Sequence, residues 1–174
     1  MLSSIRRESA AFLIALVVIV GEVAGAGRQP EAVRSTNSRL ARAIGQGSVR
    51  SATFRRMVEA LRATDVIIHV ESGDCDCRRA NACLSLLAAS GGVRYLRASV
   101  SLRRLDVELI EQIGHELQHA LEIAGQAEII SDATLAAYYR SHSQGCGRLT
   151  HCFETAAART AGQAVRTELY HPGK

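Results

Sequence analysis

Hydrophobic residues recur at helical spacing across residues 106–125, and polar residues occupy most of the positions between them. The hydrophobic stripe consists of Ile110, Ile113, Leu117, Ala120, Leu121 and Ala124. Side chains three and four positions apart lie on one face of a helix, so the pattern predicts an amphipathic helix packed on a core. Asp106 is a suitable N-cap for this helix, and Gly125 is a suitable residue just past its end.

Five other segments have shorter helical patterns. They cover residues 38–44, 51–63, 80–89, 131–141 and 153–169. We expect Gly45 and Gly47 to end the first of these helices and Ser51 to cap the second. The pair Gly91 and Gly92 should turn the chain after the third.

Two segments have strand patterns, and together with the helices they indicate the fold class. Residues 66–70 form a β-branched run, and residues 94–102 alternate between polar and hydrophobic side chains. We therefore predict an α+β fold in which a small mixed or antiparallel sheet packs on the helix at residues 106–125. In the C-terminal helix, Ala156, Ala157 and Gly162 keep the surface thin, so that helix could pack tightly against the helix at residues 106–125.

Residues 1–26 have the layout of an export signal. Arginines at positions 6 and 7 precede an apolar run at residues 10–20, and Ala24, Gly25 and Ala26 form a small-residue cleavage site. Cleavage after Ala26 would leave no membrane span in the mature chain. The alternative is a retained membrane anchor, because Glu22 lies just before the cleavage site. Both place the protein in the periplasm or outside the cell, with a lead-in at residues 27–50 and one domain at residues 51–174.

The charge pattern argues against a nucleic-acid partner. The net charge is +4, and all of the basic residues except Lys174 are arginines scattered along the chain. Tryptophan is absent and other aromatic residues are few, so platforms for base stacking are not evident. We expect a peptide or protein partner instead, and a monomeric protein.

Five cysteines lie beyond the export signal, where an oxidising compartment would permit disulfides. Cys75 or Cys77 could pair with Cys83, and Cys146 could pair with Cys152 across a short loop. One thiol must remain unpaired, because the number is odd. A zinc cluster at Cys75 and Cys77 is the weaker alternative, since paired C-x-x-C motifs are missing.

The strongest candidate for chemistry is the pattern H-E-x-x-H formed by His115, Glu116 and His119. On a helix, both imidazoles lie on one face and can bind a single zinc ion. Glu116 projects about 100° away. From there it could take a proton from a water whose pKa the metal lowers to roughly 7. The plainer alternative is a pair of surface histidines on an amphipathic helix.

Three acidic residues could supply a third zinc ligand. Glu154, in the predicted C-terminal helix, is our first choice. Glu122 shares the helical face of His115 and His119, but three side chains from one straight helix do not easily converge on a tetrahedral ion. Glu122 would serve more naturally as a partner for the second nitrogen of an imidazole. Glu128 is a weaker third option.

The H-E-x-x-H motif resembles that of the zincin metallopeptidases, and the resemblance extends over residues 65–169. The metzincin continuation H-x-x-G-x-x-H is absent, because Glu122 and Gly125 stand where it needs Gly and His. A gluzincin-like site with a later glutamate ligand fits better. The resemblance implies a minimal zincin-like core, and it implies that the strand at residues 94–102, just before the motif helix, is an edge strand that aligns a peptide.

Two functional hypotheses follow. In the first, His115, His119 and Glu154 hold one zinc ion, and Glu116 acts as general base in peptide-bond hydrolysis. The donor to the developing oxyanion would then be one of Tyr138, Tyr139, His142 or His151. In the second, the chain is an exported, non-catalytic binding domain of zincin fold that recognises a peptide or protein partner.

Overall fold

The computed structural model describes residues 31–75, 82–142 and 154–171 and has the α+β fold predicted from the sequence. The described elements, in chain order, are β1 (Val33–Arg34), α1 (Ser38–Arg50), α2 (Ala52–Arg62), β2 (Val66–Ser72), β3 (Ala82–Ser90), β4 (Val93–Val100), α3 (Asp106–Ala124), α4 (Asp132–His142) and α5 (Ala156–Tyr170). The helix that carries the H-E-x-x-H motif is α3. Residues 33–50, which the sequence treated as a lead-in, belong to the same folded unit, because Leu40 and Ala43 of α1 are buried in the core.

The four strands form one mixed sheet in the order β1-β2-β4-β3. Strands β1, β2 and β4 are parallel, and β3 runs antiparallel to β4. A tight turn at Gly91 and Gly92 joins β3 to β4, and both residues have positive φ angles, of 60° and 75°. Glycine adopts such angles without a steric penalty, so this turn has the residues that a two-residue hairpin needs.

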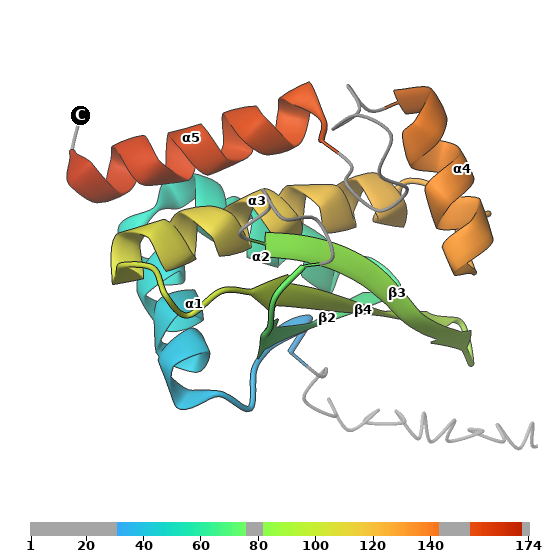
Figure 1. Ribbon diagram of the computed structural model, residues 1–174, viewed down its shortest axis with the longest axis horizontal. Coiled ribbons are helices and arrows are strands. Elements are labelled where there is room, and N and C mark those ends of the chain that lie inside the picture. The colour runs from blue at the N-terminus through green and yellow to red at the C-terminus, as the bar shows by residue number, and fades with distance from the viewer. Residues whose placement is uncertain (1–30, 76–81, 143–153, 172–174) are drawn as a thin grey trace, which may run out of the picture.

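Helix α3 lies between the sheet and α5, with α1 and α2 beside it (Figure 1). Its predicted stripe is borne out, because Ile110, Ile113, Leu117 and Ala120 are fully buried. They meet the inner face of the sheet, where Ile68, Val70, Leu96 and Ala98 are also buried. The opposite side of α3, which carries His115, faces α5.

The prediction of a helix at residues 80–89 is wrong, because Ala82–Ser90 is strand β3. Alanine and leucine favour a helix in isolation. Here the glycine turn folds the segment back along β4, and main-chain pairing outweighs that preference. The same strand corrects a second expectation: β4 lies between β2 and β3, so it is not an edge strand. Among the described strands, β3 is the edge on this side of the sheet.

Three helix ends also differ from the predictions. Helix α1 continues through Gly45 and Gly47 to Arg50. A Cβ at Gly47 would lie 2.9 Å from side-chain atoms of Ile110 and Phe54, so this glycine allows close packing. The N-cap of α3 is Leu105, not Asp106, and its N–H donates to Glu108. Helix α5 begins after Thr155, so Glu154 precedes the helix. Ser51 caps α2 as predicted.

Helices α3 and α5 approach closely, as predicted, but of the three small residues named for this packing only Gly162 lies against α3, because Ala156 and Ala157 are exposed. A Cβ at Gly114 of α3 would lie 2.9 Å from Cγ2 of Val165. A Cβ at Gly162 of α5 would lie 3.4 Å from Cβ of His115. The glycines therefore bring α5 directly against the motif.

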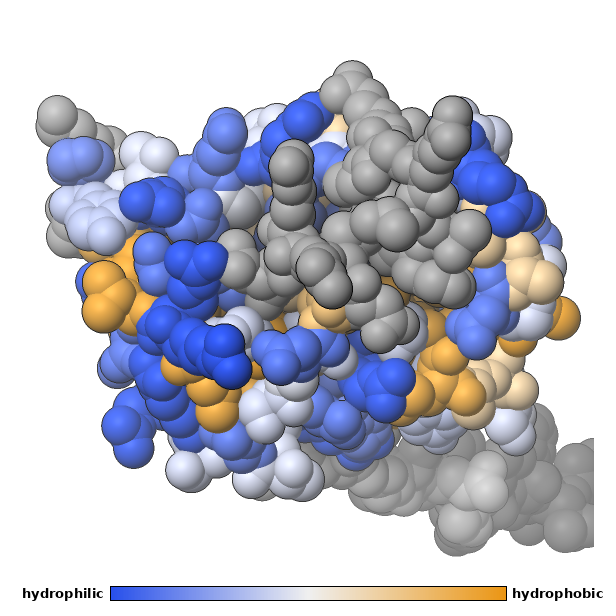
Figure 2. Space-filling model, in the orientation of Figure 1, coloured by the Kyte–Doolittle hydropathy of each residue, from blue (hydrophilic) through white to orange (hydrophobic). Residues whose placement is uncertain are grey.

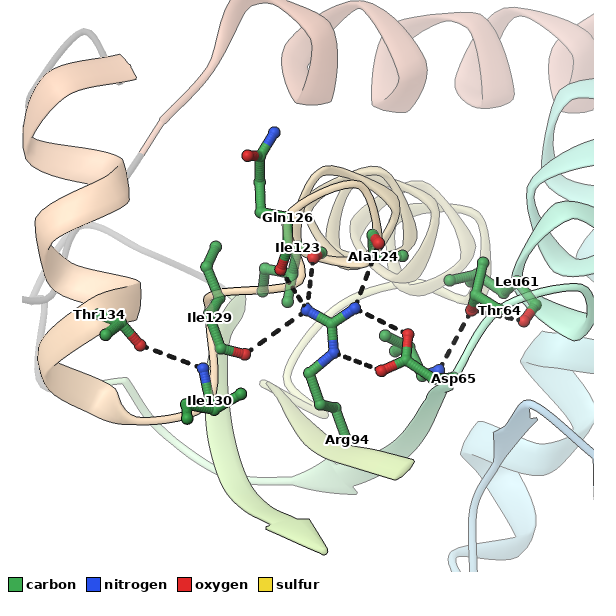
Figure 3. A network of polar contacts seen from close by, with 11 residues as sticks. Leu61, Thr64, Asp65, Arg94, Ile123, Ala124, Gln126, Ile129, Ile130 and Thr134 are labelled. Carbon is green, nitrogen blue, oxygen red and sulfur yellow. Dashed lines mark hydrogen bonds and ion pairs between the residues drawn. The ribbon is translucent and has the colours of Figure 1, made fainter. Parts of the chain in front are cut away.

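A buried arginine holds the C-terminal end of α3 in place (Figure 3). Arg94 is 4% exposed, and its Nε and one terminal nitrogen donate to Asp65 at 2.7 Å each. The guanidinium also donates to the carbonyls of Ile123 at 2.7 Å and Gln126 at 2.6 Å. It thereby ties the sheet to the last turn of α3, whose carbonyls have no partners within the helix. In the sequence, Arg94 was recognisable only as a polar residue of a segment that alternates between polar and hydrophobic side chains.

Cys75 and Cys83 form a disulfide that joins the segment after β2 to the beginning of β3. This is one of the two pairings considered for Cys83. Cys77, Cys146 and Cys152 lie outside the described residues.

The surface is mainly hydrophilic on the face in Figure 2, where hydrophobic patches are small and separated. In the described parts of the chain, no helix is both long and apolar enough to cross a membrane. The apolar run at residues 10–20 and the cleavage site at Ala26 fall outside those parts.

Candidate metal centre

The two histidines of the motif lie one helical turn apart on the side of α3 that meets α5. Their ring centroids are 4.9 Å apart, and the rings are inclined at 74° to one another. His119 is 4% exposed and His115 is half-buried. The rings therefore converge, as the spacing predicted.

Glu154 reaches the same place from the segment before α5. Its Oε1 atom lies 3.7 Å from Nε2 of His115. One ligand atom from each of His115, His119 and Glu154 lies within 4.8 Å of the others, so this group could hold one metal ion. Although Glu154 is not in the helix as predicted, it precedes the N-cap of α5 and is carried to the site by the beginning of that helix.

Unpartnered polar atoms are concentrated in this group. Four buried side-chain atoms of the described residues have no hydrogen-bond partner: Nε2 of His119, Oε1 of Glu154, Oε2 of Glu116 and Oε1 of Gln112. Buried polar atoms are almost always paired, because an unpaired one loses its hydration without compensation. Three of the four belong to the motif or to Glu154. A cation bound between the two histidines and Glu154 would be the missing partner of Nε2 of His119 and of Oε1 of Glu154.

Glu116 is buried beside this candidate metal-binding group, with 3% of its surface exposed. Burial disfavours the carboxylate and raises the pKa of Glu116 to about 7, against the effect of the neighbouring His119. The carboxyl therefore lies in an environment where it can both accept and release a proton near neutral pH.

The two histidines have opposite pKa shifts. Burial and the nearby His119 lower the pKa of His115 to about 4, so its imidazole is neutral at pH 7 and has a lone pair for a metal. Burial would also lower the pKa of His119, but the hydrogen bond to Glu122 and the Glu116 carboxylate outweigh it and raise the pKa. For the carboxyl of Glu154, burial has the opposite effect and raises the pKa.

Glu122 contacts the outer nitrogen of His119, as the sequence predicted for an acidic residue at that position. Its Oε2 lies 2.9 Å from Nδ1 of His119. Burial opposes ionisation of Glu122, but hydrogen bonds from His119 and Thr155 hold its pKa below the ordinary value. Of the three acidic candidates, only Glu154 joins the ligand group of the described residues, and Glu128 is exposed.

The four candidate oxyanion donors occupy different places. The hydroxyl of Tyr139 is 3.1 Å from Nδ1 of His119, so it lies on the ring edge that faces Glu122. Tyr138 stacks on His142 with ring centroids 4.4 Å apart, and His142 is exposed. His151 lies outside the described residues. Tyr139 is therefore placed to hold the ring of His119 in position.

The sequence reasoning missed Thr155. Its hydroxyl donates to Oε1 of Glu122 at 2.7 Å and accepts from the N–H of Ala158 at 3.0 Å. Threonine is a favoured N-cap, and the alanines that follow it are strong helix formers. These signals could have placed the helix start at Ala156 and separated Glu154 from the helix.

Searches against family models, curated proteins and solved structures find no match for this chain.

Proposed function

We propose that the chain is a zinc-dependent peptidase, with His115, His119 and Glu154 as the zinc ligands and Glu116 as the general base. The observation that carries the proposal is the convergence of two imidazoles and a carboxylate whose inner atoms, Nε2 of His119 and Oε1 of Glu154, are buried without partners in the described parts of the chain. Two histidines and a carboxylate are a ligand set found in catalytic zinc sites, which keep the fourth position open.

The chemistry divides between the metal and Glu116. A zinc ion held by this group would act as a Lewis acid, polarising a substrate carbonyl and lowering the pKa of a water to roughly 7. Glu116 would remove the proton of the attacking water and deliver it to the amine that leaves when the C–N bond breaks. Its Oε2 atom has no hydrogen-bond partner among residues 31–75, 82–142 and 154–171, so it is available to contact that water.

The edge strand β3 supports a peptide as the substrate. It pairs with β4 on one side, and the exposed residues near its end include Leu87 and Ala88. Strand β3 also contacts α3, which carries the motif. An extended peptide could add to β3 through main-chain hydrogen bonds and so lie beside α3.

The Cys75–Cys83 disulfide supports the export expected from the N-terminal sequence. Disulfides persist in the periplasm and outside the cell, whereas the cytosol keeps thiols reduced. We therefore propose that the peptidase acts in one of those compartments.

The experiment that tests this function combines metal analysis with a peptide-library cleavage assay. Wild-type protein should contain close to one zinc per chain and cleave peptides. Glu116→Gln should keep zinc and lose cleavage by about 10²–10⁴-fold, the usual contribution of a general base. Glu128→Gln is the matched control, because it makes the same change at an exposed residue and should cleave like wild type.

Two results would reject peptide hydrolysis by this site. One is wild-type protein that binds no metal, and the other is a Glu116→Gln variant as active as wild type. Wild-type protein that binds zinc but cleaves no peptide would favour the second hypothesis, a binding domain that uses the exposed edge of β3.

A further inference from the structure

We propose that Thr155 is a positioning residue that couples the placement of Glu154 to that of His119 through the carboxylate of Glu122. The proposal rests on the metal site proposed above and adds residues that support it from outside. Thr155 directly follows Glu154 in the chain and is 8% exposed.

The carboxylate of Glu122 joins two elements of the site. Its Oε2 atom contacts Nδ1 of His119 at 2.9 Å, and its Oε1 atom accepts from the hydroxyl of Thr155 at 2.7 Å. The hydroxyl of Tyr139 in α4 lies 3.4 Å from Oε2. One side chain of α3 therefore contacts a metal-ligand candidate and the N-cap residue of α5.

The hydroxyl of Thr155 serves both partners at once. It donates its hydrogen to Glu122 and accepts from the N–H of Ala158. The second hydrogen bond caps α5. Because one oxygen performs both tasks, the beginning of α5 has a fixed position relative to Glu122. The side chain of Glu122 is 12% exposed and that of His119 is 5% exposed, so water competes little for these hydrogen bonds.

Glu154 depends on this anchor because its carboxylate accepts a hydrogen bond from the backbone N–H of Thr155. Among the described residues its Oε1 atom has no hydrogen-bond partner, and its distance of 3.7 Å from His115 is longer than a hydrogen bond. The backbone next to it is held by the Thr155 contact. We infer that Glu122 sets the orientation of His119 and the position of Glu154 together, so that both ligands are in place before a metal binds.

A different role for Thr155 would be capping alone. A cap stabilises α5 whether or not its hydroxyl reaches Glu122, so its loss would affect folding without acting specifically through Glu154. The two roles differ in how a Thr155 variant combines with a Glu154 variant, because residues that act through one another have non-additive effects.

The experiment measures zinc affinity by competition with a chelator. Thr155→Val should weaken zinc binding by about 10–100-fold, as is usual for partners of metal ligands. Thr155→Ser retains the hydroxyl and should bind like wild type. In a Glu154→Gln background, Thr155→Val should cause a much smaller loss. An equal loss in both backgrounds, or no loss in the wild-type background, would overturn the proposal.

Two further variants separate positioning from stability. Thr155→Gly lacks the hydroxyl, but glycine is an acceptable N-cap, so it should fold even where Thr155→Val does not. Asn37 caps α1, because its side chain accepts hydrogen bonds from the backbone N–H groups of Arg39 and Leu40, and Asn37→Ala removes this cap. Asn37→Ala should lower stability and leave zinc affinity unchanged.

A measurement on metal-free protein distinguishes failure of this proposal from failure of the proposed function. The ¹⁵N chemical shifts of the His119 ring should change in Thr155→Val and Thr155→Gly but not in Thr155→Ser, because Glu122 loses one of its anchors. Unchanged shifts in all three would reject the link between Thr155 and His119. If the variants show these shift changes but wild-type protein binds no zinc, the zinc site is rejected instead.

Discussion

The Nδ1 atom of His119 lies 2.9 Å from Oε2 of Glu122, while the other ring nitrogen of His119 is buried and has no partner in the part of the chain that the structure describes. The residues are three positions apart on α3, so the contact forms within one helix. It orients the ring from its outer edge and leaves Nε2 available to the group that includes Glu154. One helical segment thus supplies a candidate metal ligand and the residue that supports it.

Tyr139→Phe should lower the free energy of unfolding by about 1 kcal/mol, the usual net value of a buried hydrogen bond. The hydroxyl of Tyr139 lies 3.1 Å from Nδ1 and 3.3 Å from the carbonyl oxygen of His119, and phenylalanine removes it without leaving a large cavity. Urea unfolding measures the change. Tyr138→Phe is the control, since Tyr138 is more exposed, and an effect as large there would contradict the assignment.

Arg94→Met should destabilise the protein by about 1–3 kcal/mol, the range for buried polar groups that lose their hydrogen-bond partner. The change leaves Asp65 without its partner, and it removes donors to carbonyls at the end of α3. Arg97→Met, on the same strand but exposed, should change stability little. Chemical denaturation of the two variants makes the comparison. Similar losses in both would show that the Arg94 network does not carry this stability.

The Asp65–Arg94 contact should also appear in the pH dependence of stability. The hydrogen bond between Asp65 and Arg94 holds the pKa of Asp65 below the ordinary value of 3.8, although burial alone would raise that pKa. The folded state therefore favours the carboxylate, so the stabilisation is complete above the unfolded-state pKa and disappears as pH falls through the folded-state pKa.

Urea unfolding from about pH 6 to about pH 2 tests this dependence. Asp65→Asn should lose stability less steeply on acidification than wild type does. Asp74→Asn, at an exposed position after β2, is the control and should follow the wild-type slope. Parallel curves for wild type and Asp65→Asn would contradict the prediction.

The sequence predicted the parts of the fold whose information is local. The stripe through Ile113 and Leu117 identified α3, and the β-branched run at residues 66–70 identified β2. The spacing of His115 and His119 fixed two members of the candidate site before any tertiary contact was considered. Glu154 was also named, although its expected place inside a helix was wrong.

Features that depend on distant partners were not visible in the sequence. Strand β3 contains residues that favour a helix, and only its pairing with β4 makes it a strand. The role of Arg94 depends on carbonyls some 30 residues away at the end of α3. Thr155 is a recognisable cap, but its contact with Glu122 follows from the packing of α5 on α3. Periodicity carries no information about such contacts.

The close packing of α3 and α5 gives the last prediction, which concerns Gly114. Alanine is favoured over glycine in a helix by about 1 kcal/mol, but overpacking a core costs about 1–3 kcal/mol. Because a Cβ at Gly114 would lie 2.9 Å from Val165, Gly114→Ala should destabilise the protein. Gly45→Ala, where no atom lies within 4 Å of the added Cβ, should stabilise it. Adding Gly114→Ala to a Val165→Ala background should cost less, and equal costs in both backgrounds, measured by urea unfolding, would show that this contact is not the cause.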